Sequence, residues 1–465
     1  MKCGPTFSEF LQASLRAWAL RRIEDCVLSL ALPLESVDPL TQLPVIADRH
    51  HFSFLWDSSP GLTLAAAGKC QNFELVGQRR FELAQRFSDE TLNRLIDGTP
   101  EAPSHAKPRV LLAFTFFEQT TEIKIGTKNI PAVQAILPSW QLTRQTGQSW
   151  LRLNAVVAHE ADVRDFVEQL WLMREKLVTS SKQVWLTSIN MLGVSISQNW
   201  QNNYRLALAK GIDLVNSGEL KKLVLAVKES IVLKEPLNPL VVLSNLRIRQ
   251  QGSCRFLWKR ASDESFFGAS PERLLSCRNG LIRTDALAGT ASKDDDGYDL
   301  LRSDKDLREH ELVVSSIHNQ MIQQGLEPYR SRSPRLAKHG HLVHLHTPIT
   351  AMNKGLSPLQ LADALHPTPA VAGLPRPKAF KWLRTLESFD RGNYAAPIGW
   401  IDNLGNAEFR VAIRCAYARG TSLELIAGAG LVKGSVVEKE LQEVKLKLGV
   451  MADHVSSESL TKLVK

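Results

Sequence analysis

The stretch LELIAGAGLVKGSVVEKELQEVKLKL, residues 423–448, decides the fold, because it combines an expected strand, a glycine turn and a helix. The apolar run Leu423–Ile426 predicts a short strand. Gly428, Gly430 and Gly434 predict a turn in which the backbone closely approaches another group. We therefore expect this segment to lie beside a site, and the remaining motifs are weighed against it.

The helix expected after the turn has an apolar face with charged residues beside it. Ser435 suits its N-cap, and Glu438 follows three residues later as in a capping box. The apolar face comprises Val437, Leu441, Val444, Leu448 and Met451. At about 100° per residue, Glu440, Glu443 and Lys447 fall within about 60° of one another at the edge of that face. They either line a site or form a solvated face, where a Glu443–Lys447 pair contributes only about 0.3–0.5 kcal/mol.

The composition is that of an ordinary globular protein. The chain has 465 residues, of which 44% are hydrophobic and 23% charged, enough for one large domain or about two to three ordinary ones. No apolar run is long enough to span a membrane, and polar residues interrupt the apolar N-terminus, which argues against a secretory signal. The six cysteines are scattered without a CxxC motif. We therefore expect reduced thiols, a cytoplasmic location, no zinc site and no disulfides.

The net charge of +9 comes from Lys and Arg residues that are spread along the chain and interleaved with acids. No dense basic run or aromatic–basic repeat supports a nucleic-acid-binding protein. A small anionic substrate accounts for a basic surface equally well. We expect a small-molecule substrate, no nucleic acid and no membrane span.

Four carboxylates on two expected helices form a candidate metal site. Asp306 and Glu309 stand one turn apart on a long helix expected at 303–324, and Glu440 and Glu443 lie on the last helix. Carboxylate oxygens suit a hard cation such as Mg²⁺, which also binds anionic substrates. Alternatively, Asp306 serves only as the capping partner of Ser303.

Two further residues suit acid–base chemistry. Lys222 stands at the mouth of an apolar strand, and Glu272 follows a proline in an apolar context. A desolvated lysine can act as a base near neutrality, and a desolvated glutamate can hold its proton and act as an acid. Taken by itself, Lys222 is more often an exposed surface residue.

Nine separated motifs resemble those of the chorismate-utilising enzymes, which include isochorismate synthases, salicylate synthases and the large subunits of anthranilate and aminodeoxychorismate synthase. In chain order they are KLVLAV (222–227), FGASPERLL (267–275), LAGTA (287–291), SDKDLREHELVV (303–314), HLHTP (344–348), LHPTPAVAGLP (365–375), YAAPIGW (394–400), FRVAIRCA (409–416) and AGAGLVKGSVVEKELQE (427–443). The resemblance is specific over residues 201–455, the expected chorismate-binding catalytic region. It is weaker over residues 1–200, the expected N-terminal part of the same domain.

The resemblance implies a role for each matching position. Lys222 matches the base that activates water for attack at C2 of chorismate, and Glu272 the acid that protonates the departing C4 hydroxyl. Glu309 and Glu443 match direct Mg²⁺ ligands, with Asp306 and Glu440 acting through water. The implied substrate-binding residues are Gly289, Thr290, His344, Ala370, Gly373, Arg414, Gly428, Ala429, Gly430 and Lys447.

Within the family, the resemblance implies an Mg²⁺-dependent, reversible conversion of chorismate to isochorismate. The aminating members lack a lysine at the position of Lys222, and no glutaminase-like segment is present, so we expect no glutaminase subunit. The HPTPAVAG motif (366–373) is more similar to isochorismate synthases than to salicylate synthases, which continue by eliminating pyruvate; the latter are the alternative. Val227, Ala396 and Ile426 depart from the family pattern and bear on pocket shape.

The expected architecture is α+β. Strands and helices mix without a regular βαβ rhythm, which argues against a doubly wound sheet. The resemblance implies a single large domain with two facing β-sheets and helices packed outside, as a monomer or homodimer. A dinucleotide-binding module is an alternative reading of the glycines at 428–434, but their spacing is GxGxxxG and only about 30 residues follow, too few for the βαβ unit that it requires.

Overall fold

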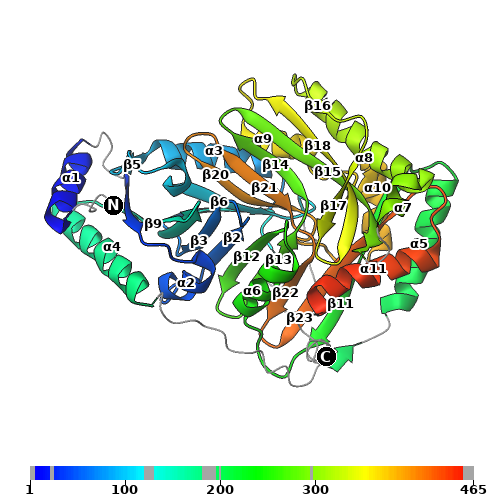
Figure 1. Cartoon of the computed structure of the whole chain (residues 1–465), viewed down its shortest axis with the longest axis horizontal. Helices are drawn as coiled ribbons and strands as arrows, with labels where there is room; N and C mark the ends of the chain where they lie inside the picture. The colour runs from blue at the N-terminus through cyan, green and yellow to red at the C-terminus, as the bar shows by residue number, and fades with distance from the viewer. Residues whose placement is uncertain are drawn as a thin grey trace.

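The computed structural model describes residues 6–20, 26–119, 130–180, 195–197 (backbone), 200–293 and 297–453, and these residues form two large β-sheets with helices packed against them (Figure 1). Strands from residues 1–200 and from residues 201–455 are present in both sheets. The prediction of an α+β fold with two large sheets in one domain is confirmed.

Sheet A joins strands from both ends of the chain. In spatial order it consists of β10 (Ser195–Ser197), β11 (Lys222–Val232), β23 (Ser422–Leu431), β22 (Cys415–Arg419), β13 (Glu264–Ser270), β12 (Cys254–Ala261), β2 (Ser53–Asp57), β3 (Thr63–Ala67), β8 (Trp140–Gln145), β9 (Gln148–Val156), β1 (Val27–Leu34) and β5 (Leu95–Asp97), with β19 (Gly373–Leu374) beside β11. β2–β3 and β8–β9 are antiparallel hairpins within this sheet.

Sheet B faces sheet A. Its order is β16 (Tyr329–Arg330), β18 (Leu342–Met352), β15 (Leu281–Ser292), β14 (Arg273–Arg278), β21 (Ala407–Val411), β20 (Pro397–Asp402), β6 (Arg109–Phe114), β7 (Val133–Leu137) and β4 (Gln71–Leu75), with β17 (Arg335–His339) beside β18. One apolar core contains side chains from both sheets. Trp258 Nε1 of sheet A donates to Gln134 Oε1 of sheet B at 3.0 Å, so the inner faces are in direct contact.

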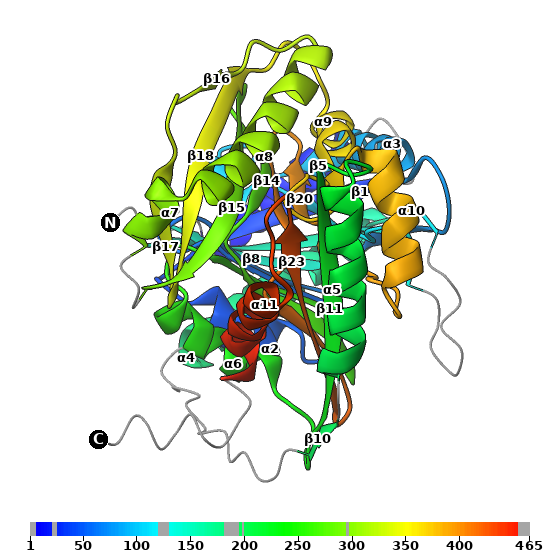
Figure 2. The ribbon, with the colours of Figure 1, turned by 90° about the vertical axis from the view of Figure 1, so that its right-hand side faces the viewer.

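The helices cover the sheets. They are α1 (Phe7–Ala19), α2 (Pro39–Ile46), α3 (Arg80–Asn93), α4 (Glu160–Ser180), α5 (Trp200–Asn216), α6 (Pro239–Arg249), α7 (Tyr298–Arg302), α8 (Asp304–Gln323), α9 (Pro358–Leu365), α10 (Arg376–Leu386) and α11 (Val437–Ala452), with a 3-10 turn η1 (Ser104–Ala106). α5 packs on β11, α8 on β15 and α11 on β23. Figure 2 views the end of the molecule where these three helices lie.

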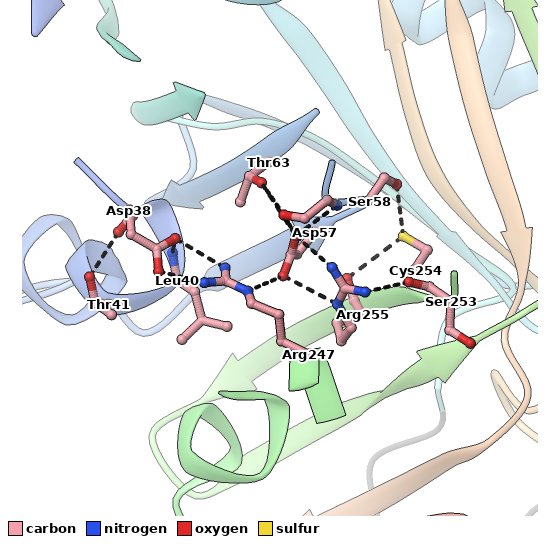
Figure 3. Close-up of polar contacts among 11 residues, drawn as sticks. Asp38, Leu40, Thr41, Asp57, Ser58, Thr63, Arg247, Ser253, Cys254 and Arg255 are labelled. Carbon is pink, nitrogen blue, oxygen red and sulfur yellow. Dashed lines mark hydrogen bonds and ion pairs between the residues drawn. The ribbon is translucent and has the colours of Figure 1, made fainter. Parts of the chain in front are cut away.

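A buried ion-pair network ties the two halves of the chain together (Figure 3). Asp57, at the end of β2, pairs with Arg255 of β12 at 2.8 Å and with Arg247 of α6 at 2.6 Å. Arg247 also pairs with Asp38, the N-cap of α2. Burial opposes ionisation of Asp57, but the two guanidinium groups keep its pKa well below the usual value. The pairing of β2 with β12 is therefore reinforced by charge.

The segment around the glycines differs from the prediction in two ways. β23 does not end at Ile426 but continues through Gly428 and Gly430 to Leu431, and of these glycines only Gly434 has a positive φ (+92°). Ser435 is not the N-cap. Its hydroxyl instead accepts the N–H of Val432 at 3.1 Å and closes the turn, and α11 begins at Val437 without a side-chain cap. The reason is that pairing with β11 holds the glycines extended, which moves the turn towards the C-terminus.

The N-terminus of α8 is capped by a side chain. Ser303 is the N-cap of α8, and its hydroxyl accepts the backbone N–H of Asp306 at 3.2 Å. Because this bond uses only the backbone of Asp306, capping does not occupy its carboxylate. No helix in the described part of the chain is both long and apolar enough to cross a membrane.

Candidate active site

A pocket lies where β11 and β23 of sheet A meet β15 and β18 of sheet B, beside α8 and α11. Twelve of the sixteen residues expected in the site line it: Lys222, Glu272, Gly289, Thr290, Glu309, His344, Ala370, Arg414, Gly428, Gly430, Glu443 and Lys447. Asp306, Gly373, Ala429 and Glu440 do not. Residues separated by up to 225 positions in sequence are thus brought to one cavity.

Lys222 is the first residue of β11 and is buried in this pocket. Its side chain is 1% exposed, which contradicts the surface alternative. Its Nζ donates to Glu309 Oε1 of α8 at 2.8 Å. The next residue, Leu223, points to the other face, because β-strand side chains alternate. An amine in an apolar strand is tolerated here because a carboxylate partner faces it.

Glu272 lies in the connection between β13 and β14 and is 3% exposed. Burial raises the pKa of Glu272 to about 7, although Thr368, Lys222 and Arg414 act in the opposite direction. Thr368 Oγ1 donates to Glu272 Oε1 at 3.2 Å. A carboxyl group with this pKa is protonated in a large fraction of molecules at neutral pH, so it can serve as a general acid.

Beyond Ile426, where its pairing with β22 ends, β23 presents backbone groups to the pocket. The N–H groups of Val224 and Ala226 bond to partners outside β23, at Ala372 O and Glu387 Oε1. Antiparallel strands alternate between bonded and non-bonded pairs, so Leu225 and Ala429 form a bonded pair and the backbone of Gly428 points away from β11. Lys447 Nζ donates to Gly428 O at 2.9 Å, as this geometry requires.

Because side chains alternate along a strand, the side chain of Ala429 points away from the pocket. Its side chain lies on the face that α5 covers, where Leu225 and Leu431 contact Gly211. Gly373 pairs with Leu223 in the β19–β11 ladder, and a Cβ on it would meet Lys222 O at 2.4 Å. Both residues shape strand packing behind the pocket and do not line it.

Arg414 and His344 each have a buried nitrogen atom that makes no hydrogen bond within the described residues. Arg414 has a left-handed backbone (φ +54°), and burial lowers the pKa of its guanidinium to about 10, so it stays charged at neutral pH. His344 Nδ1 donates to Gly289 O at 3.0 Å, and burial keeps the pKa of His344 well below its usual value. Within the described residues, Arg414 Nη1 and His344 Nε2 have no hydrogen-bond partner. They offer a donor and an acceptor to a ligand.

The carboxylates of α8 and α11 are each near a lysine. Lys305 Nζ of α8 lies 2.8 Å from Glu440 Oε1 of α11, which shows that the two helices face one another. Glu443 pairs with Lys447 on the same helix. Burial and the neighbouring Glu443 raise the pKa of Glu440. Burial alone would raise the pKa of Glu443, but the charge of Lys447 and its hydrogen bond lower that pKa below the usual value.

These carboxylates suit a divalent cation by their chemistry. In the part of the chain that is described, no three His, Cys, Asp or Glu side chains stand together as ready metal ligands. Glu309, Glu440 and Glu443 nevertheless lie on facing helices at or beside one pocket, and Asp306 lies near Gly289 at its margin. Burial and, after it, the neighbouring Glu443 raise the pKa of Glu440, and an added cation would relieve the repulsion between these two carboxylates.

Sequence reasoning missed several pocket residues. Tyr394, Val371, Leu287 and Ile413 also line the cavity. Ile426, which was expected to bear on pocket shape, lines it as well, whereas Val227 and Ala396 do not. Tyr394 is buried, and burial raises the pKa of its phenol well above the usual value, so the hydroxyl remains a neutral donor. Its position within YAAPIGW was the available signal, because that motif belongs to the resemblance.

The glycine at position 430 is required by close packing, which gives a testable expectation. A Cβ there would lie 2.7 Å from Glu309 Oε1 and 3.2 Å from Lys222 Cε. We expect Gly430→Ala to separate the Lys222–Glu309 pair and to lower kcat/KM by roughly 100-fold, since small displacements of catalytic groups have effects of this size. Steady-state kinetics would measure it. Gly449→Ala on α11 is the matched control, because the nearest atom is 3.9 Å away; equal kinetics in the two variants would contradict the expectation.

The glycines are not part of a dinucleotide fingerprint. Gly428 and Gly430 lie within β23, which is antiparallel to both β11 and β22. The dinucleotide motif requires a parallel βαβ unit with the glycines in the turn. The alternative of a dinucleotide-binding module is therefore wrong.

Comparison with known proteins connects this pocket with a family. The family described as chorismate binding enzyme matches residues 12–456. The isochorismate synthase MenF of Bacillus subtilis (strain 168) is 30% identical over 449 residues, which cover 93% of this chain and 94% of that protein. The salicylate biosynthesis isochorismate synthase of Pseudomonas aeruginosa is 37% identical over 270 residues, 55% of each chain.

Solved structures show the same fold. MenF, the menaquinone-specific isochorismate synthase of Escherichia coli, has a TM-score of 0.73 and 24% identity, covering 96% of this chain and all of that one. Anthranilate synthase component I of Streptococcus pneumoniae has a TM-score of 0.68 and 17% identity, covering 85% and 93%. Since the family match runs through nearly the whole chain, including every element that forms the pocket, this chain belongs to the chorismate binding enzyme family.

Proposed function

We propose that this protein is an isochorismate synthase that interconverts chorismate and isochorismate. The observation that carries the proposal is the presence of a buried lysine, Lys222, and a buried, partly protonated carboxyl group, Glu272, in one pocket. Relatives named isochorismate synthase, one of which aligns along nearly the full chain, support it.

The two groups suit opposite ends of a hydroxyl exchange. Lys222 takes a proton from water as the water oxygen bonds to C2 of the ring. Glu272 gives its proton to the C4 hydroxyl, which leaves as water when its bond to C4 breaks. The two ring double bonds each shift by one position along the path C2–C1–C6–C5–C4, from C1=C2 and C5=C6 to C1=C6 and C4=C5, so electrons balance without any redox change. Return of a proton from Lys222 to Glu272 resets the site, and the same groups serve the reverse reaction.

The remaining lining residues suit a substrate with two carboxylates. Arg414 has a buried Nη1 without a partner among the described residues, and the Lys447 ammonium lies at the Gly428 edge of β23. His344 and Tyr394 add a neutral acceptor and a neutral donor. Fixed, desolvated positive charge of this kind holds carboxylates in place.

We further propose that Mg²⁺ binds between α8 and α11. Glu309 and Glu443 would hold it directly, with Asp306 and Glu440 acting through water. When bound, such an ion neutralises a substrate carboxylate and orients the ring. The chemical step itself is assigned to Lys222 and Glu272.

The remaining assignments are also proposals. The described cysteines Cys70, Cys254, Cys277 and Cys415 are free thiols, which suits the reducing cytoplasm. We propose chorismate as the sole organic substrate, with water as the nucleophile and no glutaminase subunit, in a monomer or homodimer. The product would serve a quinone, siderophore or salicylate pathway, because the relatives' names include menaquinone, vibriobactin and salicylate.

A product assay tests the function. Purified protein is incubated with chorismate and Mg²⁺ at neutral pH, without ammonia or coupling enzymes, and the products are separated by liquid chromatography. We expect a chorismate–isochorismate mixture that approaches equilibrium, and loss of turnover when EDTA removes the metal. Restoration by added Mg²⁺ is the control. Formation of salicylate and pyruvate would instead identify a salicylate synthase, and unchanged chorismate would refute both.

A further inference from the structure

Thr368 lies directly against the general acid without reaching the pocket. Its Oγ1 donates to Glu272 Oε1 at 3.2 Å, and the two residues are 1% and 3% exposed. Glu272 lines the pocket, whereas Thr368 does not. Any influence of this hydroxyl on the substrate must therefore pass through Glu272.

The hydroxyl is held in place by the turn that carries it. Thr368 O accepts the N–H groups of Val371 and Ala372, each at 3.1 Å. Arg391 Nη1 donates to Val371 O at 2.7 Å. Ala372 O accepts the N–H of Val224 at 2.8 Å, two residues from Lys222 on β11. The turn bearing Thr368 is thus fixed to the strand that carries the expected base.

Glu272 is also restrained from its backbone. Its N–H donates to Ser270 Oγ at 3.2 Å, and Ser270 Oγ donates to Val411 O at 2.6 Å. With the backbone fixed at one end and Oε1 fixed at the other, the orientation of the carboxyl group is determined. The carbonyl oxygen of a neutral carboxyl group is its better hydrogen-bond acceptor, so the bond from Thr368 to Oε1 favours the acidic proton on Oε2.

We propose that Thr368 is a positioning residue for the reaction above, holding Oε1 of Glu272 so that the proton on Oε2 is presented to the C4 hydroxyl of the substrate. The inference rests on the proposed function. Thr368 makes no bond to substrate in this scheme, and its contribution is to the geometry and the proton affinity of the acid.

The charges around Glu272 determine the direction of the expected pH effect. Burial raises its pKa most; the Thr368 hydrogen bond, Lys222 and Arg414 lower it, and Asp285 of β15 raises it. The other titratable groups lining the pocket are Glu309, Glu443, His344, Lys447 and Tyr394. A hydroxyl that donates to a carboxylate stabilises the charged form. Removing it therefore raises the pKa of Glu272, and the acid stays protonated to higher pH.

The test compares Thr368→Val, which keeps the shape and removes the hydroxyl, with Thr368→Ser, which keeps the hydroxyl. For T368V we expect kcat to fall about tenfold, KM to stay within about twofold, and the alkaline limb of the kcat–pH profile to move to higher pH. T368S should restore kcat and the profile. Thr284→Val is the matched control, because Thr284 is fully buried and its Oγ1 has no partner in the described structure.

Two results would overturn the proposal: a T368V profile that matches those of wild type and T284V, or a T368S variant as impaired as T368V. If T368V does not fold, as judged by circular dichroism, Thr368→Cys replaces it, because its S–H is a weak donor of similar size. Failure of the wild-type protein to form isochorismate would refute the proposed function instead. The two failures are therefore distinguishable.

Discussion

Glu272→Gln is expected to lower kcat by about 10³-fold while chorismate still binds. The amide is nearly isosteric with the carboxyl group but has no acidic proton for the C4 hydroxyl, and loss of a general acid typically has effects of about 10²–10⁴-fold. Steady-state kinetics of isochorismate formation would give kcat, and calorimetric titration with chorismate would give the affinity.

The wild-type pH profile gives an independent check on the same residue. The pKa of Glu272 is raised to about 7 by burial, and the acid must be protonated to act, so the forward rate should fall as pH rises through about 7. That limb should be absent from E272Q. The matched control is Glu424→Gln. Glu424 lies at the end of β23 away from the pocket, where it pairs with Lys228 and its side chain is 36% exposed. An E272Q enzyme within tenfold of wild type would refute the role of Glu272 as the acid.

Lys222→Gln is expected to lower kcat by a similar factor, because it removes the group that accepts a proton from water. Glutamine keeps a donor for Glu309 but cannot accept a proton from water, so kcat should fall about 10³-fold with chorismate binding retained. Steady-state kinetics and the same titration separate catalysis from binding. Choosing Gln also avoids leaving the buried Glu309 carboxylate without a partner.

Lys228→Gln is the control for this variant. Lys228 lies on the same strand and also pairs with a glutamate, but it is 28% exposed, against 1% for Lys222. We expect K228Q to keep nearly wild-type kinetics, since exposed pairs contribute little. Equal losses in K222Q and K228Q would show that the effect comes from strand stability and would remove Lys222 as the base.

The sequence predicted the elements of the site well where a local pattern sufficed. Ser303 is the N-cap of α8, a capping role that its residue type and its position before Asp306 indicate. The burial of Lys222 could not be predicted in this way, because it depends on Glu309, 87 positions later. Only the resemblance indicated that these two residues belong to one site.

Gly428 and Gly430 show how a local sequence pattern can give a wrong prediction. Gly428 and Gly430 were expected in a turn because glycine favours turns, but they are extended in β23. Their lack of a side chain is required by the approach of Leu225 O to Gly428 and of Glu309 to Gly430. The same strand pairing places Ala429 on the face towards α5. Neither contact leaves a signal in the local sequence, because both depend on strands and helices distant along the chain.

The interleaving of strands from both halves has a consequence during synthesis on the ribosome. β2 pairs with β12, and β6 pairs with β20 near the end of the chain. At roughly 5–20 residues per second, β6 emerges roughly 15 to 60 s before its partner. Throughout that interval the nascent polypeptide carries open strand edges, which promote aggregation. Truncated translation products that stop before β12 should therefore require chaperone binding to remain dispersed.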